Sequence, residues 1–344
     1  MADGDTARLH RTPGQVMAGL LVEGSPAPFR LALATAFAAF VPIFVTFKLA
    51  PHMAAVPFLG ALAMIVGIRG SGFRVACLAV AVGGCAVVLV QLFAPWAPLI
   101  AAVLALTAAL FGLRGHARPM IVVCVTWSVF TGSIVPTSAP LHVLAFYWGG
   151  AAFALGVAWL ARAAYSFPAE GRRSSAHALT LGLLFAAGFA FSTWFGRHYF
   201  GTLGSHGYFF PLAFAFLCLP PHSQFFGNTI KRCLGTALGW VISIGLAQVA
   251  LPVWFSIGLG IVCYVMFQWL VSWSKLVSMA FLTVAIIVMI GIVAPGQPIA
   301  TERLDAVLAA AAMASVLAVV AALVLRIVSP NALQELAGGT PSRP

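Results

Sequence analysis

Two acidic residues near the carboxyl end of this chain stand where they could move protons. The chain has only seven acidic residues, and Glu302 and Asp305 open a long apolar stretch within Thr301-Glu302-Arg303-Leu304-Asp305. A carboxylate inside an apolar span marks a site of proton or substrate coupling, here with Asp305 paired to Arg303. The alternative is structural: Thr301 caps a helix, and the acids in its first turn face the positive end of the helix dipole. The sequence leaves both interpretations open.

A pair of cations, Lys231 and Arg232, lies between two apolar runs and could bind an anion. With Gln224 and Asn228 as hydrogen-bond partners, these side chains could hold an anionic substrate where helices break. They could also serve only as anchors at a membrane face. The small residues of the segment 235–239 predict a helix face that lets neighbouring backbones come close.

Two further polar residues flank this region and are candidates by position. His222 could be protonated during transport, although a histidine at a membrane interface commonly has no functional role. Tyr208 could stack on an aromatic solute, or it belongs to the belt of aromatic residues at the interface. We expect His222 to join Glu302, Arg303 and Asp305 in proton coupling, and Tyr208 to contact the substrate.

Other chemistries lack their sequence motifs. No histidine or cysteine spacing is typical of a metal site, and neither a Walker-type phosphate loop nor a G-x-S-x-G segment occurs. The six cysteines lie in or beside apolar runs without a C-x-x-C pair, which favours a role in packing. We therefore expect no metal ion, no cofactor and no enzymatic activity.

Composition indicates an all-α polytopic membrane protein. Hydrophobic residues make up 62% of the 344 positions and charged residues only 7%, more apolar surface than a soluble domain can bury. Residues 1–23 are polar and lack the apolar core of a cleavable signal, so the first span should direct insertion. The twelve predicted spans are 31–49, 53–68, 75–93, 97–113, 119–135, 141–161, 177–196, 206–221, 233–251, 253–271, 276–294 and 304–327.

The basic residues predict the orientation of these spans. The net charge of +11 could suggest nucleic-acid binding, but the cations fall in short turns and no soluble basic domain carries them. All lysines and arginines except Lys48, Arg197 and Arg303 lie on one side of a twelve-span arrangement. Because cytoplasmic loops are enriched in Lys and Arg, both termini are expected in the cytoplasm. The predicted partner is therefore the lipid bilayer and not nucleic acid.

The two halves of the chain also repeat. An even number of spans in each repeat predicts two parallel six-helix bundles, a pseudo-dimer, with Arg74 as the counterpart of Arg232 in substrate binding. The prolines of the second span in each half either kink a helix or expose backbone along a central pathway. The matched pairs are Arg74 and Arg232 (158 apart), Trp96 and Trp254 (158), Pro57 and Pro211 (154), and Pro136 and Pro295 (159). The predicted segments are an N-terminal tail 1–28, a first repeat 29–165, a cytoplasmic linker 166–175, a second repeat 176–329 and a C-terminal tail 330–344.

The pattern Arg-x-x-Gly-Thr-x-x-Gly at 232–239, behind a proline-containing span and a polar turn, resembles the fusaric acid resistance-like superfamily, which includes bacterial aromatic acid exporters. The resemblance is strongest over 208–327 and fainter over 29–165. It implies export of small, aromatic organic acids across the inner membrane. The chain lacks the large soluble domain of longer members, so the role of that domain does not carry over.

Taken together, these observations predict an efflux transporter of small organic anions. Proton coupling is expected by elimination, because no ATP-binding motif occurs. Two alternatives stay open. Plant malate channels share a distantly similar six-helix plan, which would make the chain a passive anion channel. Some exporters of the superfamily work with a periplasmic adaptor protein, which would make it a membrane subunit of a larger export assembly.

Overall fold

The computed structural model describes residues 22–132, 139–162, 174–200, 206–220, 222–249, 251–293, 298–329 and 331–332. Every regular element in these ranges is helical. The predicted linker 166–175, both predicted tails and the prolines at 136 and 295 fall mostly or wholly outside them. The main helices are α2 (Phe29–Leu49), α3 (Ala55–Ser71), α4 (Phe73–Leu92), α5 (Ala97–Leu113), α6 (Ala117–Ser128), α7 (Pro140–Leu160), α8 (Ser175–Phe195), α10 (Phe209–Leu217), α11 (Phe225–Ala247), α12 (Val253–Leu270), α13 (Lys275–Val293) and α14 (Ile299–Val328).

Ten helical stretches in the described part of the chain are long and apolar enough to cross a membrane. This fits the predicted multi-pass membrane protein. The predicted spans 119–135 and 206–221 instead form the shorter helices α6 and α10, which are almost entirely buried and pack against each other. Short apolar helices of this kind fit the core of a bundle, where they need not match the bilayer thickness. Within the described ranges the arrangement of twelve full-length spans is therefore not confirmed.

Two helix starts differ from the sequence prediction. Helix α11 begins at Phe225, so Asn228, Lys231 and Arg232 lie in its first two turns and not in a turn that precedes it. Helix α14 begins at Ile299 after Pro298, and Thr301 makes no capping hydrogen bond. Apolar runs locate the middle of a helix, whereas backbone hydrogen bonds extend the helix through flanking polar residues.

The second-span prolines also have a different role from the one predicted. Pro57 and Pro211 each occupy the third position of their helix, α3 and α10. In the first helical turn a proline removes no i to i−4 hydrogen bond. They therefore start helices and do not break them.

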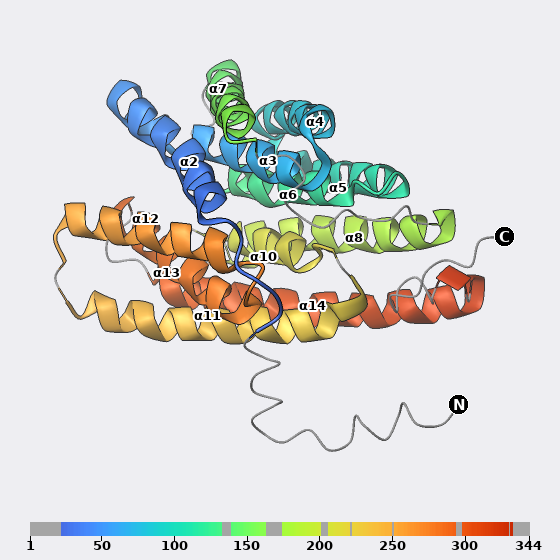
Figure 1. Ribbon diagram of the computed structural model, residues 1–344. Coiled ribbons are helices and arrows are strands. Elements are labelled where there is room, and N and C mark those ends of the chain that lie inside the picture. Colours follow the sequence, from blue (N-terminus) through green and yellow to red (C-terminus); the bar gives the residue numbers. More distant parts are fainter. Residues whose placement is uncertain are drawn as a thin grey trace.

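The helices form two groups with a shared middle (Figure 1). Helices α2 to α7 lie on one side and α11 to α14 on the other, with α8 and α10 between them. Within the first group α3 packs on α2, α4, α6 and α7; within the second α13 packs on α11 and α12, and α14 packs on α8, α10 and α11. The first group meets the middle helices where α5 packs on α8 and α6 on α10, and it meets the second group where α2 packs on α12.

Glycines set the closest helix contacts. On α11, a Cβ at Gly239 would lie 2.7 Å from the carbonyl oxygen of Ala280, and one at Gly235 would collide with the carbonyl oxygen of Leu276. In the first helix group, a Cβ at Gly60 of α3 would likewise collide with the carbonyl oxygen of Tyr147 in α7. The predicted small face of α11 is thus confirmed, since α11 and α13 approach at backbone distance.

Positive charge is concentrated at one end of the helices. We call the end where α11 and α13 begin the basic end; of the described lysines and arginines, all except Lys48, Arg197 and Arg303 lie there. The opposite end holds the first turn of α14, and we call it the Glu302 end.

Candidate functional site

A cavity of about 380 Å³ opens near the basic end, between α5, α6, α8, α10, α11 and α14. Its walls are mostly alanine, glycine and phenylalanine. The rings of Phe185 and Phe214 stack with centroids 5.9 Å apart and 19° between their planes, and Phe185 also stacks on Phe189 at 5.7 Å. Such a volume accommodates a small organic molecule, and stacked rings favour one with an aromatic or flat apolar body.

Four polar residues line part of this cavity: His177, His222, Ser223 and Gln224. His222 donates from Nε2 to the Cys218 carbonyl oxygen at 3.1 Å, and its ring centroid lies 6.5 Å from that of His177. Two of the predicted site residues, His222 and Gln224, therefore lie together on the cavity wall. The cavity therefore has mostly apolar walls and a short polar edge.

Arg232 joins α11 to the end of α10. Its side chain is buried, with 9% exposed; Nη1 donates to the Phe216 carbonyl oxygen at 2.5 Å, and the guanidinium lies 4.8 Å from the centre of the Phe216 ring. Phe216 belongs to the last turn of α10, and its carbonyl oxygen also accepts from Leu219 N at 3.3 Å. The arginine therefore adds a charged donor at the carboxyl end of α10, where a cation is favourable.

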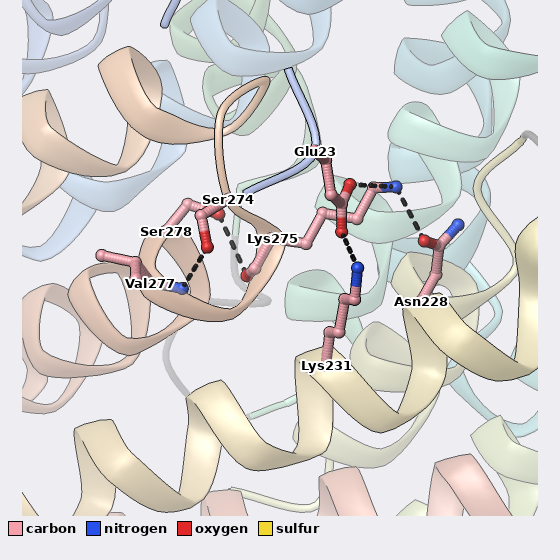
Figure 2. A network of polar contacts seen from close by, with 7 residues as sticks. All are labelled: Glu23, Asn228, Lys231, Ser274, Lys275, Val277 and Ser278. Atoms are coloured by element: carbon pink, nitrogen blue, oxygen red, sulfur yellow. Dashed lines mark hydrogen bonds and ion pairs between the residues drawn. The ribbon is translucent and has the colours of Figure 1, made fainter. Parts of the chain in front are cut away.

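The neighbouring cation, Lys231, takes part in a charged network (Figure 2). Glu23 accepts from Lys231 Nζ at 2.8 Å through one carboxylate oxygen and from Lys275 Nζ at 2.7 Å through the other. Lys275 also donates to the Asn228 side-chain oxygen at 2.7 Å. Of the predicted anion-binding residues, Lys231 thus already binds a carboxylate, and Asn228 contacts Lys275, a further member of the network that the sequence analysis did not single out.

The carboxyl of Glu23 stays charged in this network. Burial alone raises the pKa of Glu23, but hydrogen bonds and charge attraction from Lys231 and Lys275 outweigh burial, and the pKa lies below its ordinary value. A carboxylate with a lowered pKa contributes stability that is present above its unfolded-state pKa and is lost as the pH falls through the folded-state pKa.

We therefore expect Glu23→Gln to lower the melting temperature at neutral pH but not in acid. The difference between wild type and variant should be complete above about pH 4.3, the ordinary glutamate pKa, and should shrink below it. Thermal unfolding of the detergent-solubilised protein at several pH values measures this. A difference that persists unchanged at pH 3 would contradict the assignment of the charge to Glu23.

At the Glu302 end a second polar cluster surrounds the start of α14. Glu302 lies 2.7 Å from Nδ1 of His206. Arg303 is buried, with 3% exposed, and its guanidinium lies 5.7 Å from the ring centre of Phe209. Arg303 Nε and the Tyr208 hydroxyl are both buried without a hydrogen-bond partner among the described residues. Tyr208, predicted to contact substrate beside Arg232, is instead part of this cluster.

The predicted pair of Arg303 and Asp305 does not form. Arg303 is buried whereas Asp305 is exposed, and the described residues give Asp305 no ion-pair partner. Residues two positions apart on a helix point to different sides, so the two cannot both face the interior. His222 is also separate from this cluster, because it stands beside the start of α11 at the basic end. Of the four predicted coupling residues, only Glu302 and Arg303 lie together.

In the first half, the buried arginine is not the predicted one. Arg74 is exposed in the first turn of α4, whereas Arg69, at the end of α3, is 1% exposed. Arg69 donates from Nη1 to Gln268 of α12 at 3.1 Å, and Gln268 donates to the Tyr264 hydroxyl at 3.2 Å. This network joins the two helix groups. The available signal was the position of Arg69 directly after an apolar run, between two glycines.

Residues 183–319, which include α10 to α13 and most of α8 and α14, match the family model described as fusaric acid resistance protein-like. This segment belongs to that family. The resemblance predicted for 208–327 is confirmed over the matched residues, and the fainter one over 29–165 lies outside them. No curated protein and no solved structure gives a significant match. Members of the fusaric acid resistance-like family are membrane transporters, which supports transport and not catalysis at the level of the family.

Proposed function

We propose that the chain exports small aromatic organic acids across the inner membrane in exchange for protons. The observation that carries this proposal is the cavity at the basic end. It offers stacked phenylalanines for an aromatic ring, and most of its polar edge, His222 to Gln224, directly precedes the helix α11 that carries Lys231 and Arg232. An amphipathic anion needs both features, an apolar wall for its ring and cations for its carboxylate.

The Glu302 end supports proton coupling. Glu302 lies 2.7 Å from His206, the buried Arg303 follows it in α14, and carboxylates and histidines within membrane spans are the residues that commonly relay protons. We place the coupling role on Glu302 and not on the exposed Asp305. The two sites then stand at opposite ends of the helices, one for the organic anion and one for the proton.

Helix packing supports the proposed parallel repeat, with halves 29–165 and 176–329. The pairs α2–α3, α2–α7 and α3–α7 recur as α8–α10, α8–α14 and α10–α14, and the pairs α4–α6 and α4–α7 recur as α11–α13 and α11–α14. Between the halves, α5 packs on α8 as α12 packs on α2. Reciprocal contacts of this kind are typical of a pseudo-twofold arrangement. The basic end would face the cytoplasm by the positive-inside rule, with both termini on that side.

Transport in proteoliposomes tests the function. We choose phthalate, an aromatic dicarboxylate, because two negative charges keep it from crossing a protein-free bilayer. Saturable phthalate uptake that responds to an imposed pH gradient is expected. Flux that neither saturates nor responds to the gradient would favour a passive anion channel. Absence of transport by the purified protein, with recovery in cells, would favour a subunit that needs a periplasmic adaptor.

Replacing Arg232 by alanine is expected to lower phthalate uptake at least about tenfold, since an interaction of about 1.4 kcal/mol corresponds to that factor. The variant loses a buried cation in the second turn of α11 and its hydrogen bond to the Phe216 carbonyl oxygen. Arg232→Lys, which keeps the charge, should retain more uptake than the alanine variant. Arg30→Ala removes an exposed cation at the same end and serves as the matched control. Wild-type rates in Arg232→Ala would remove this residue from the site.

A further inference from the structure

The carboxylate of Glu23 occupies a site built for a carboxylate. Each oxygen accepts from a different ammonium group, and Asn228 holds one of these ammonium groups in place (Figure 2). The three charged side chains are partly covered, with 13–20% exposed. Two cations around one two-oxygen anion match the geometry by which proteins bind carboxylic acids.

Glu23 reaches this site on a short segment, residues 22–28, which we call the Glu23 arm. The arm precedes α2 and runs along the turn between α12 and α13. Glu23 N donates to the Trp273 carbonyl oxygen at 2.7 Å, and Ala27 N donates to that of Trp269 at 3.0 Å. A Cβ at Gly24 would stand 2.8 Å from the Ser272 carbonyl oxygen, so the arm lies directly against this turn.

The site keeps an excess of positive charge with Glu23 in place. Lys231 and Lys275 face one carboxylate, and Arg232 is close enough to interact electrostatically with it. Within the described ranges the other carboxylates, Glu302 and Asp305, both belong to the Glu302 end. Among the described residues, a solute anion that reaches the basic end therefore meets more cations than carboxylates.

The site and the cavity share one piece of helix. Phe225, Phe226 and Gly227 of α11 line the cavity, and Asn228 and Lys231 follow in the next turn. A molecule whose ring enters the cavity would carry its acid group along the same helix start. The Glu23 carboxylate is held by Lys231 one to two turns further along this helix.

We propose that Lys231, Lys275 and Asn228 form the carboxylate subsite for the transported acid, and that Glu23 occupies it as an internal competitor. This inference rests on the proposed function. Ion pairs that are partly exposed add little net stability, so a solute carboxylate can displace Glu23. Because Glu23 occupies the subsite, the apparent affinity for the solute is the intrinsic affinity multiplied by the fraction of subsites that are free of Glu23. Displacement would release the arm from the turn between α12 and α13.

Calorimetric titration of the purified full-length protein with phthalate tests the competition. Glu23→Gln keeps the shape of the side chain and removes its charge; it should bind phthalate about three- to tenfold more tightly than wild type, the change expected when an internal competitor worth up to about 1.4 kcal/mol is lost. Val22→Ala alters an exposed neighbour on the same arm and should bind like wild type. The double variant Glu23→Gln, Lys275→Gln should lose the gain, and neutral phthalamide should bind all four proteins alike.

The outcomes separate this inference from the proposed function. Equal or weaker phthalate binding by Glu23→Gln overturns the competition, and export stands if phthalate transport is still present. Tighter binding by Glu23→Gln without transport by any of the proteins, either in proteoliposomes or in cells, supports the subsite and overturns export. Tighter binding of phthalamide together with phthalate would show a general opening of the cavity and would also overturn a carboxylate subsite.

Discussion

Gly235→Ala is expected to destabilise the protein, whereas Gly245→Ala on the same helix is expected to leave it unchanged or more stable. Alanine is the better helix former by about 0.5–1 kcal/mol, so both changes favour the helix itself. At Gly235 the added methyl group would collide with the Leu276 carbonyl oxygen and would stand 2.7 Å from Met279 Cβ, whereas at Gly245 it meets nothing within 4 Å. Forcing α11 away from α13 should cost about 1–3 kcal/mol.

Thermal unfolding of both variants in the same detergent measures this difference. The melting temperature is expected to change in opposite directions in the two variants, whereas helix propensity alone would raise it in both. A melting temperature for Gly235→Ala at or above that of wild type would mean that α11 and α13 do not pack at backbone distance.

Ala318→Trp is expected to reduce phthalate transport at least about tenfold, equivalent to about 1.4 kcal/mol of lost substrate binding. Ala318 of α14 lines the cavity, so an indole ring there would fill much of a space of about 380 Å³ and displace an aromatic solute. Ala318→Leu should give an intermediate loss, because it fills less of the same space.

The matched control lies on the other face of the same helix. Ala312 is exposed and does not line the cavity, so Ala312→Trp should transport at the wild-type rate. Size-exclusion profiles of all three variants identify any that fail to fold. Undiminished transport by a folded Ala318→Trp protein would place the substrate path elsewhere.

The amino-acid sequence alone determined where most helices lie. Apolar runs are long enough to exclude any other structure in a bilayer, because each backbone polar group must be satisfied within its own segment. It also determined the close face of α11, since Gly235 and Gly239 recur at a spacing of four, and the concentration of cations in alternate turns. Each of these features is local, so neighbouring residues suffice to predict it.

Only the tertiary structure decided which charges are buried and which residues they meet. Arg69 and Arg74 look alike in sequence, yet the first is buried and bonded to Gln268 of α12, whereas the second is exposed. Glu23 pairs with Lys231 across 208 residues. Whether a charged side chain is buried depends on where its helix packs and on which groups offset the free-energy cost of its desolvation. Those partners come from segments far apart in the chain.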